Sequence, residues 1–232
     1  MQESIQIRYL DTIPDERVAG QPVQSLIPIG SWASIEEFWE KGLSQNLRKK
    51  IRRAERDGLQ VKGERSNEAF EVFYGLYLKT MHRHGTPPYS REIMHRLHDR
   101  LDAEIVRVED GDGEVVAAYL VIRAGNITLF QWAGFNAMAT LGNASALGEW
   151  QAIKKAMEKG CDWFDLGRSS DGGPAFKHKQ YWKPEVYRCC VYPPIYKSVY
   201  SKYSLASKVW RLLPPAFAAK IGPAICQRLK DA

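Results

Sequence analysis

Helical periodicity and strand-like alternation divide this chain into a series of short elements. Ser34-Ile35-Glu36-Glu37 has the pattern of a capping box, in which a serine and a glutamate satisfy free backbone amides at the start of a helix. We predict that this helix runs to about Asp57, with a break near Gly42, and ends at Gly58. Apolar positions at helical spacing predict further helices over residues 67–83, 90–99 and 145–159.

Strand signals fall between these helices and after them. Short turns join three strands over residues 103–109, 114–123 and 127–135, which predicts an antiparallel meander. Shorter strands are expected over residues 5–10, 25–29, 59–62, 163–166 and 185–192. The resulting order is an α/β (α+β) fold with a mixed, mostly antiparallel sheet flanked by helices, because it lacks the strict alternation of a doubly wound fold.

The C-terminal segment, residues 204–232, contains two amphipathic helical pieces that Pro214-Pro215 separates. Lysines and arginines lie between the apolar positions of both pieces. Two interpretations follow: a helical tail that packs on the domain, or an element that docks on a membrane surface or a protein partner.

Composition limits the class of protein. The chain has 232 residues, of which 44% are hydrophobic, so it can build one substantial core or one domain and part of another. Lysine and arginine number 33 against 27 acidic residues, which favours anionic partners such as phosphates, nucleic acid or acidic lipid. The sequence has no secretory signal and no apolar run of membrane-spanning length. We therefore expect a cytoplasmic protein, with peripheral contact to the inner membrane face through the tail as an alternative.

The candidate chemistry centres on the segment Asp165 to Lys177. A strand leads into a polar, glycine-containing loop and then into the pair Phe176-Lys177. Arg168 and Lys177 could meet an anion or a developing oxyanion at the end of this strand. For Arg168 the alternative is a salt bridge to Asp165 or Asp171, and for Lys177 it is a surface position.

A basic helical segment gives the second clue. It contains Arg48, Lys49, Arg52 and Arg53, which fit either a solvated helix face or a contact to phosphate groups of a nucleic acid or nucleotide. The histidines at 82, 84, 95 and 98 have no cysteine or carboxylate at ligand spacing. We therefore predict no metal site.

Three segments resemble the FemAB-related branch of the GNAT acyltransferase superfamily. The first is the basic segment and the strand after it, residues 48–61, and the second is Arg83-His84-Gly85-Thr86-Pro87-Pro88-Tyr89. The third runs from Trp150-Gln151-Ala152-Ile153 through Phe164-Asp165-Leu166-Gly167-Arg168-Ser169 to Phe176-Lys177. The tail sequence around Trp210 and Ile221-Gly222-Pro223 is similar to FemAB-like proteins associated with exosortase (PEP-CTERM) loci.

The resemblance covers roughly residues 30–195 and implies a domain organisation. Residues 34–195 would form a GNAT-like acyltransferase domain, and residues 196–232 a C-terminal amphipathic helical tail. FemAB-type proteins usually carry two GNAT-like domains, whereas the basic helix begins early in this chain. Residues 1–33 would then be a remnant of a first GNAT-like domain or an N-terminal lead-in segment, and a homodimer could complete the site.

The resemblance also implies an activity. Such enzymes move an acyl or aminoacyl group from an activated donor, aminoacyl-tRNA or acyl-CoA, to an amine, and here the acceptor would be a cell-envelope or exopolysaccharide precursor. No tightly bound cofactor is implied. The residues expected to take part are Lys177 and Asp165 in catalysis and Arg168, Ser169, Phe176, Trp132, Thr86, Tyr89 and Tyr181 in substrate binding.

Two questions stay open at the level of sequence. His178 and Tyr181 are weaker candidates than Asp165 for the general base. The stretch Ala133–Asn143 fits the pyrophosphate-binding loop of acetyl-CoA-dependent relatives poorly, which favours aminoacyl-tRNA as the donor without excluding acyl-CoA. The alternative to an enzyme is a non-catalytic GNAT-like module that binds nucleic acid, lipid or a protein partner.

Overall fold

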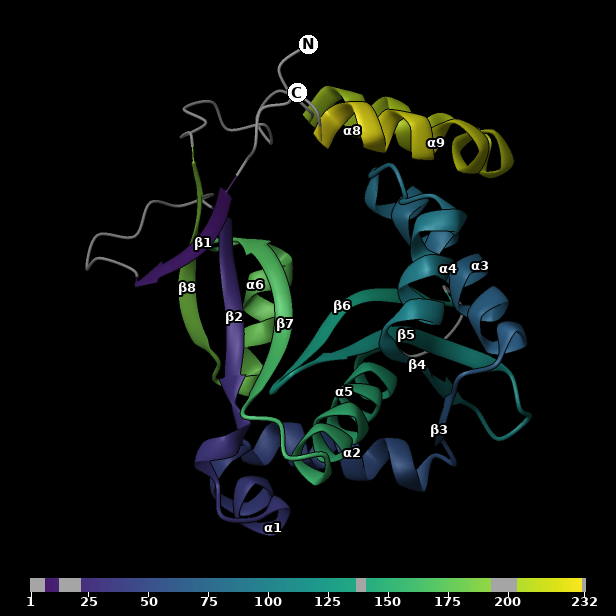
Figure 1. Ribbon diagram of the computed structural model, residues 1–232. Coiled ribbons are helices and arrows are strands. Elements are labelled where there is room, and N and C mark those ends of the chain that lie inside the picture. The colour runs from purple at the N-terminus through teal and green to yellow at the C-terminus, as the bar shows by residue number, and fades with distance from the viewer. Residues whose placement is uncertain (1–6, 13–21, 137–140, 193–203, 231–232) are drawn as a thin grey trace.

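A mixed sheet organises the molecule in a computed structural model that describes residues 7–12, 22–136, 141–192 and 204–230. Within these residues the sheet has eight strands in the order β1-β8-β2-β7-β6-β5-β4-β3 (Figure 1). The strands are β1 Ile7–Thr12, β2 Pro22–Pro28, β3 Gln60–Glu64, β4 Asp102–Glu109, β5 Val115–Ala124, β6 Ile127–Phe135, β7 Trp163–Ser170 and β8 Glu185–Tyr192.

The helices lie on both sides of this sheet and above one end of it. A π-helical turn, Phe38–Gly42, joins the first two helices, and short 3₁₀ turns occupy Ile29–Ser31 and Gln180–Trp182. The α-helices are α1 Ile35–Glu37, α2 Gln45–Arg56, α3 Asn67–His84, α4 Arg91–Arg100, α5 Leu141–Glu158, α6 Pro174–Lys179, α8 Ser204–Leu212 and α9 Pro215–Lys230.

The predicted fold class is confirmed by the pairing of the strands. β3, β4, β5 and β6 form an antiparallel ladder, which contains the expected meander. β1 pairs with β8, and β2 pairs with both β7 and β8, again antiparallel. β6 and β7 are parallel, as expected for strands that a helix, α5, connects.

Alternate residues of the strands supply two hydrophobic cores. On β5, Ala117, Tyr119 and Val121 point to the core that α2 and α5 cover. Ala118, Leu120 and Ile122 point to the opposite core, which α3 and α4 cover. This period of two along a strand buried on both faces explains why the β5 sequence is almost continuously apolar.

The predicted loop after residue 166 is wrong in its extent. β7 continues to Ser170 because β2 pairs with it as far as Pro22↔Ser170. A short helix that was not predicted, α6, then begins at Pro174, because the fixed φ and missing amide hydrogen of proline suit the first position of a helix. The polar loop is therefore confined to residues 171–173, and Phe176 and Lys177 lie on a helix.

The first predicted helix divides as expected near Gly42. The Ser34 hydroxyl accepts from the Glu37 amide at 3.1 Å, which is one half of the predicted capping box. The Glu37 carboxylate reaches the amide of Ala33 instead of that of Ser34, at 3.0 Å. Arg48 stabilises the break, because its Nη1 donates to the carbonyls of Trp39, at 2.9 Å, and Leu43, at 3.0 Å.

Helices α8 and α9 form an antiparallel pair, here called the tail hairpin, that packs on the C-terminal end of α3 (Figure 1). His82 on α3 donates from Nε2 to the Leu213 carbonyl at 2.9 Å. Gly222 on α9 lies against the Pro88 ring, so closely that a Cβ at this position would stand 2.4 Å from Pro88 Cδ. Of the two interpretations of the tail, packing on the domain is thus confirmed. Among the described residues, no helix has both the length and the apolarity of a membrane span.

Candidate functional site

The parallel strands β6 and β7 separate partway along their length. They pair at Ile127↔Trp163, Thr128↔Phe164 and Leu129↔Asp165, and beyond this point they diverge (Figure 1). Each strand then continues with its other neighbour, β5 or β2. The facing edges carry backbone amides and carbonyls that do not bond one another, which is a position where a ligand can take their place. Three predicted substrate-binding residues, Trp132, Arg168 and Ser169, lie beyond the last pair.

Asp165 holds the backbone of β7 and β2 together at the point of divergence. It is 4% exposed, and its two carboxylate oxygens accept from Nε2 of Gln24 on β2 at 2.5 and 2.6 Å. Its Oδ1 also accepts from the Gly167 amide at 2.7 Å. Gly167 has a φ of 80°, so the bulge at this position favours glycine. These contacts give Asp165 a structural task, and the catalytic role predicted for it stays a prediction.

Lys179, which the sequence analysis did not single out, fastens α6 to the same bulge. Its Nζ donates to the carbonyls of Gly167 at 2.7 Å and Arg168 at 2.9 Å. Burial lowers the pKa of Lys179 to about 8, although the nearby carboxylates of Asp165 and Glu149 oppose this shift. The Gly167 peptide is thus bound on its amide side by Asp165 and on its carbonyl side by Lys179.

Arg168, Ser169, Phe176 and Lys177 lie together at the end of β7 and the start of α6. Arg168 and Lys177 are exposed, and none of the ion pairs among the described residues includes either of them. The alternative for Arg168, a salt bridge to Asp165 or Asp171, stays a prediction. Phe176 is 7% exposed, and the Ser169 hydroxyl is buried without a hydrogen-bond partner among the described residues.

A buried carboxylate on α5 faces α6. Glu149 is 6% exposed and accepts from the Ser145 hydroxyl at 2.9 Å and from Nε2 of His178 at 3.0 Å. The indole Nε1 of Trp182, a residue of the adjoining 3₁₀ turn, also donates to Glu149. We call these four residues the Glu149 cluster. Three donors around one carboxylate satisfy it in an apolar core, where an unpaired charge would be costly.

His178 is the member of the Glu149 cluster that reaches solvent. Its side chain is 45% exposed, whereas that of Glu149 is 8% exposed. The hydrogen bond that His178 donates to Glu149 raises the pKa of His178 above its ordinary value, against the opposing effect of burial. When the imidazole is neutral, donation from Nε2 to Glu149 leaves Nδ1 as the nitrogen that can accept a proton.

Tyr181 connects this corner to the basic helix. Its ring lies 6.2 Å from that of His178 in an edge-on arrangement, and the ammonium of Lys50 on α2 lies 4.5 Å from its centroid. Tyr181 remains 45% exposed. It is therefore placed beside His178, and a substrate could reach both side chains.

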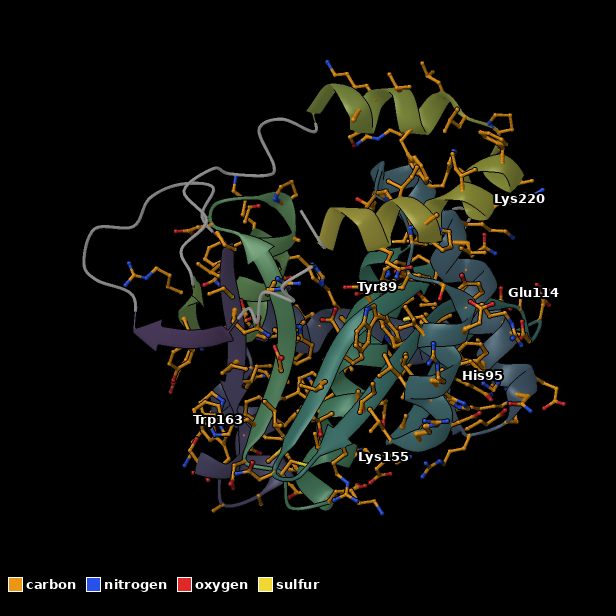
Figure 2. The ribbon with its side chains drawn as sticks, turned by 45° about the horizontal axis from the view of Figure 1, so that its top comes forward. Tyr89, His95, Glu114, Lys155, Trp163 and Lys220 are labelled. Atoms are coloured by element: carbon orange, nitrogen blue, oxygen red, sulfur yellow. The ribbon has the colours of Figure 1, made fainter. Side chains whose placement is uncertain are left out.

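Two other predicted residues, Tyr89 and Trp132, meet on the α3 side of the sheet. Their rings are 6.4 Å apart and nearly perpendicular, and Tyr89 lies beneath the tail hairpin (Figure 2). The Tyr89 backbone is fixed by the hydroxyls of Tyr74, at 3.0 Å, and Tyr77, at 3.2 Å. Thr86 is exposed in the preceding loop. The structure thus pairs Tyr89 with Trp132 on one face and His178 with Tyr181 on the other.

Three of the four predicted phosphate-binding residues line a surface hollow of about 270 Å³ beside α2, which Arg48, Lys49, Arg52, Trp39, Glu40 and Gln45 form. Arg48 is already bound to backbone carbonyls, and the Arg52 guanidinium lies 5.5 Å from the Trp39 ring. Arg53 lies outside the hollow and pairs with Asp57 at 3.5 Å. Lys49 is the cation in this hollow that is most available to an anion.

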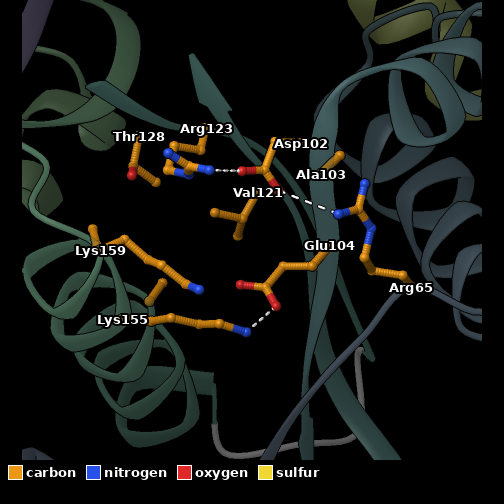
Figure 3. A pocket seen from close by; sticks show the side chains of 11 residues that line it. Arg65, Asp102, Ala103, Glu104, Val121, Arg123, Thr128, Lys155 and Lys159 are labelled. Carbon is orange, nitrogen blue, oxygen red and sulfur yellow. Dashed lines mark hydrogen bonds and ion pairs between the residues drawn. The ribbon is translucent and has the colours of Figure 1, made fainter. Parts of the chain in front are cut away.

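A second hollow, of about 200 Å³, lies at the other end of the sheet between α5 and the first residues of β4 and β6 (Figure 3). Arg65 pairs there with Asp102 at 3.2 Å, Arg123 pairs with Asp102, and Lys155 pairs with Glu104. It lies by Thr128, in the part where β6 and β7 are still paired. The hollow thus lies on the paired side of the point of divergence, and its charges largely satisfy one another.

The histidine pairs of α3 and α4 serve packing and hydrogen bonding. His98 is 3% exposed against the Phe70 ring, and His95 lies 3.0 Å from the Asp99 carboxylate. In the described part of the chain, no group of three or more histidine, cysteine or acidic side chains is placed to hold a metal ion.

Known proteins were compared with both the sequence and the fold. Residues 41–180 match the family described as acetyltransferase (GNAT) domain, and no curated protein matches the chain. Among solved structures, FemX has a TM-score of 0.62 at 14% identity, over 80% of this chain and 64% of FemX. The C-terminal domain of a protein described as lysylphosphatidylglycerol synthetase, from Agrobacterium fabrum, has a TM-score of 0.57 at 15% identity, over 88% of this chain and 66% of that domain. L-PGS from Bacillus licheniformis has a TM-score of 0.57 at 12% identity, over 90% of this chain and 68% of the L-PGS chain.

At these identities the likeness to solved structures shows the fold alone. This chain spans just under two thirds of the length of FemX and of the Agrobacterium fabrum domain. The family match is independent of them and covers more than half of the sequence, from the π-helical turn to the end of α6. It includes the basic helix, the meander, the diverging strands and three of the four residues of the Glu149 cluster, namely Ser145, Glu149 and His178. The chain therefore belongs to the acetyltransferase (GNAT) domain family, the superfamily that its sequence motifs predicted.

Proposed function

We propose that this protein transfers an acyl or aminoacyl group from an activated donor to an amine, on a cell-envelope or exopolysaccharide precursor. The observation that carries the proposal is the divergence of β6 and β7 next to an exposed histidine that a buried carboxylate orients. Diverging edges offer backbone groups to an acyl donor, and the histidine offers a base for the amine. Both features lie within the part of the chain that matches the GNAT domain.

The chemistry requires three events. The neutral amine attacks the acyl carbonyl, so that a C–N bond forms and the carbonyl oxygen becomes an oxyanion. The amine nitrogen then loses a proton, and the intermediate collapses with cleavage of the C–O bond of an aminoacyl-tRNA ester or the C–S bond of an acyl-CoA. The departing oxygen or sulfur finally takes up a proton.

Two residues of α6, His178 and Lys177, fit separate roles in these three steps. His178 would accept the amine proton at Nδ1, since Nε2 is committed to Glu149 at 3.0 Å. Lys177 is an exposed cation one residue away and would stabilise the oxyanion by its charge. Because His178 and Lys177 are adjacent on the helix that follows β7, one could act as the base while the other stabilises the oxyanion. Asp165 is a poorer base, because it is buried and already accepts three hydrogen bonds.

For the donor we favour aminoacyl-tRNA over acyl-CoA. The support is the hollow beside α2, where Lys49 and Arg52 accompany the half-buried ring of Trp39. Phosphate groups of a nucleic acid would meet cations there, and such contacts weaken steeply with salt. The loop expected to bind pyrophosphate includes residues 137–140, which lie outside the described residues.

Product analysis with a Lys177→Ala variant tests the proposal. The protein is incubated with a pool of aminoacyl-tRNA and, separately, with short-chain acyl-CoA, using glucosamine as the simplest amino-sugar acceptor, and amide products are identified by mass spectrometry. We expect enzyme-dependent amide formation that Lys177→Ala reduces by about 100-fold or more, as loss of an oxyanion-stabilising group does. The free energy of unfolding should change by less than about 1 kcal/mol.

Lys79→Ala on α3 serves as the matched control, because Lys79 is also an exposed helical lysine but lies on another element. It should retain full activity. Amide formation that Lys177→Ala leaves unchanged would remove Lys177 from the mechanism. Salt-sensitive binding of tRNA without any product from either donor would instead favour a binding module.

A further inference from the structure

Exposed apolar side chains are concentrated on the tail hairpin. Seven large hydrophobic residues are exposed within the described residues, and the three with the highest exposure all belong to it. Leu212 is 83% exposed, Val209 53% and Phe217 50%. Apolar groups gathered on one element, unlike single exposed residues scattered over a surface, mark a place of contact.

The excess positive charge of the protein lies in the C-terminal part of the sequence, which includes the tail hairpin. Residues 186–232 hold eight of the 33 lysines and arginines and one of the 27 acidic residues, which is Asp231. The remaining residues carry 25 basic and 26 acidic side chains, so they are close to neutral. The net charge of +6 is therefore a property of the C-terminal segment and not of the whole surface.

Apolar and basic side chains occupy the same outer face of each helix. On α8, Val209 and Leu212 are separated by three residues and Lys208 and Leu212 by four, which places them on one side. On α9, Phe217 and Lys220 are likewise separated by three residues, and Lys220 projects outward from the hairpin (Figure 2). Lys208 and Lys220 are both exposed.

The inner face of the hairpin is bound firmly to the domain. Trp210 is 7% exposed and Ala218 is 1% exposed. The Arg211 guanidinium donates to the His84 carbonyl at 3.3 Å, and Gly222 lies against Pro88. The outer face therefore has a fixed orientation relative to α3 and to Tyr89.

We infer that the outer face of the tail hairpin docks on the surface of a membrane that contains anionic phospholipid. Lysines beside exposed aliphatic and aromatic residues match an anionic interface, where headgroups meet the cations and the apolar groups enter the acyl boundary. A second copy of the chain is a poorer occupant, because it would bring one cationic surface against another. Docking in this way needs no spanning helix, and it is independent of the proposed transfer reaction.

Vesicle flotation of the full chain tests this inference. Vesicles of phosphatidylcholine alone are compared with vesicles that contain about 30% phosphatidylglycerol, each at low and high salt. We expect partition onto the anionic vesicles only, with a strong decrease as salt rises. Lys208→Glu and Lys220→Glu should each lower the partition coefficient by about fivefold or more, since one basic residue near an anionic leaflet contributes a factor of that order. Leu212→Asp should lower it similarly.

Ile93→Asp and Lys79→Glu are the matched controls, because they make the same kinds of change at exposed positions of α4 and α3. Both should bind vesicles as the unaltered protein does, and circular dichroism should show equal melting for all variants. Partition that the hairpin variants do not reduce, or equal partition onto neutral vesicles, would overturn the inference. So would a concentration-dependent dimer that Leu212→Asp abolishes, because this face would then join two copies.

Discussion

At the scale of single residues, Glu149 and His178 combine a buried charge acceptor with an exposed base. Glu149 lies on α5, which packs against the sheet. Its carboxylate accepts hydrogen bonds from a hydroxyl, an imidazole and an indole, which take the place of water. Because α5 packs in the core and α6 lies at the surface, the pair links a rigid element to an accessible one. Such a carboxylate orients the imidazole and stabilises its protonated form.

This arrangement predicts a pH dependence. Transfer requires neutral His178, so kcat/KM should rise with pH through the raised pKa of His178. In Glu149→Gln the stabilising charge is lost, so the pKa of His178 should fall towards its ordinary value near about 6.5, and the acidic limb should move to lower pH. Titration of the imidazole by NMR measures this shift independently of activity.

The control for this experiment is Glu158→Gln, an exposed position on the same helix, which should leave the titration of His178 unchanged. A pKa of His178 that does not fall in Glu149→Gln would contradict the assignment. The same pair affects folding: since the folded pKa exceeds the unfolded value, protonation of His178 stabilises the fold below about pH 6.5. That contribution disappears as the pH rises through the folded pKa.

Sequence alone singled out a segment for the candidate site, but it gave less about the contacts of each residue. The segment Asp165–Lys177 begins at the last residue pair of β6 and β7, a position that the sequence did not indicate. The partners of Asp165, however, are Gln24, which is 141 residues away, and Gly167, so its hydrogen bonds depend on strand pairing that no local pattern contains. Glu149 resembled one more polar position on an amphipathic helix. The signal that could have found it is an isolated acidic residue beside Trp150 in an otherwise apolar stretch.

At the scale of elements, contact between glycine and proline positions the tail hairpin. We predict that Gly222→Ala destabilises the protein by about 1 to 3 kcal/mol, since its Cβ would overlap the rigid ring of Pro88 and force the hairpin away. Gly75→Ala on α3 meets no atom within 4 Å and should be neutral or stabilising by up to about 1 kcal/mol. Chemical denaturation of both variants measures the difference.

Hydrogen exchange at the C-terminal turn of α3 supplies a second measurement for the Gly222 variant. His82 and His84 bond the hairpin there, so exchange should accelerate at those residues if the hairpin loosens. Equal stability of Gly222→Ala and the unaltered protein would show that the hairpin is not held by this contact.

Element boundaries were predictable where a cap or a turn residue sets them. The break near Gly42 and the helix end before Gly85 follow from local geometry. The extension of β7 to Ser170 was missed, because β2 causes it by pairing along the whole strand. The short helix α6 was also missed, since six residues are too few to show a helical period.

At the scale of the whole molecule, the sheet places the two N-terminal strands, β1 and β2, beside strands from much later in the chain, β7 and β8. β2 lies between β7 and β8, and its residues Val23, Leu26 and Ile27 are buried. β1 lies at the edge of the sheet and pairs with β8 alone. The sequence indicated strands near both positions but gave no order for them, because pairing over such separations leaves no local pattern. The predicted division between residues 1–33 and 34–195 therefore stays a prediction.

Two truncations test this division. A chain that begins at residue 22 loses the edge strand β1 and should still unfold cooperatively, with reduced stability. A chain that begins at residue 30 also loses β2 and should show no cooperative thermal transition. The three buried side chains of β2 contribute about 1.5 to 3 kcal/mol each, and their sum approaches the whole stability of a typical domain, about 5 to 15 kcal/mol. Calorimetry distinguishes the two outcomes. If the shorter chain melts cooperatively near the temperature of the full protein, residues 1–33 are a separate segment, as expected for the remnant of another domain.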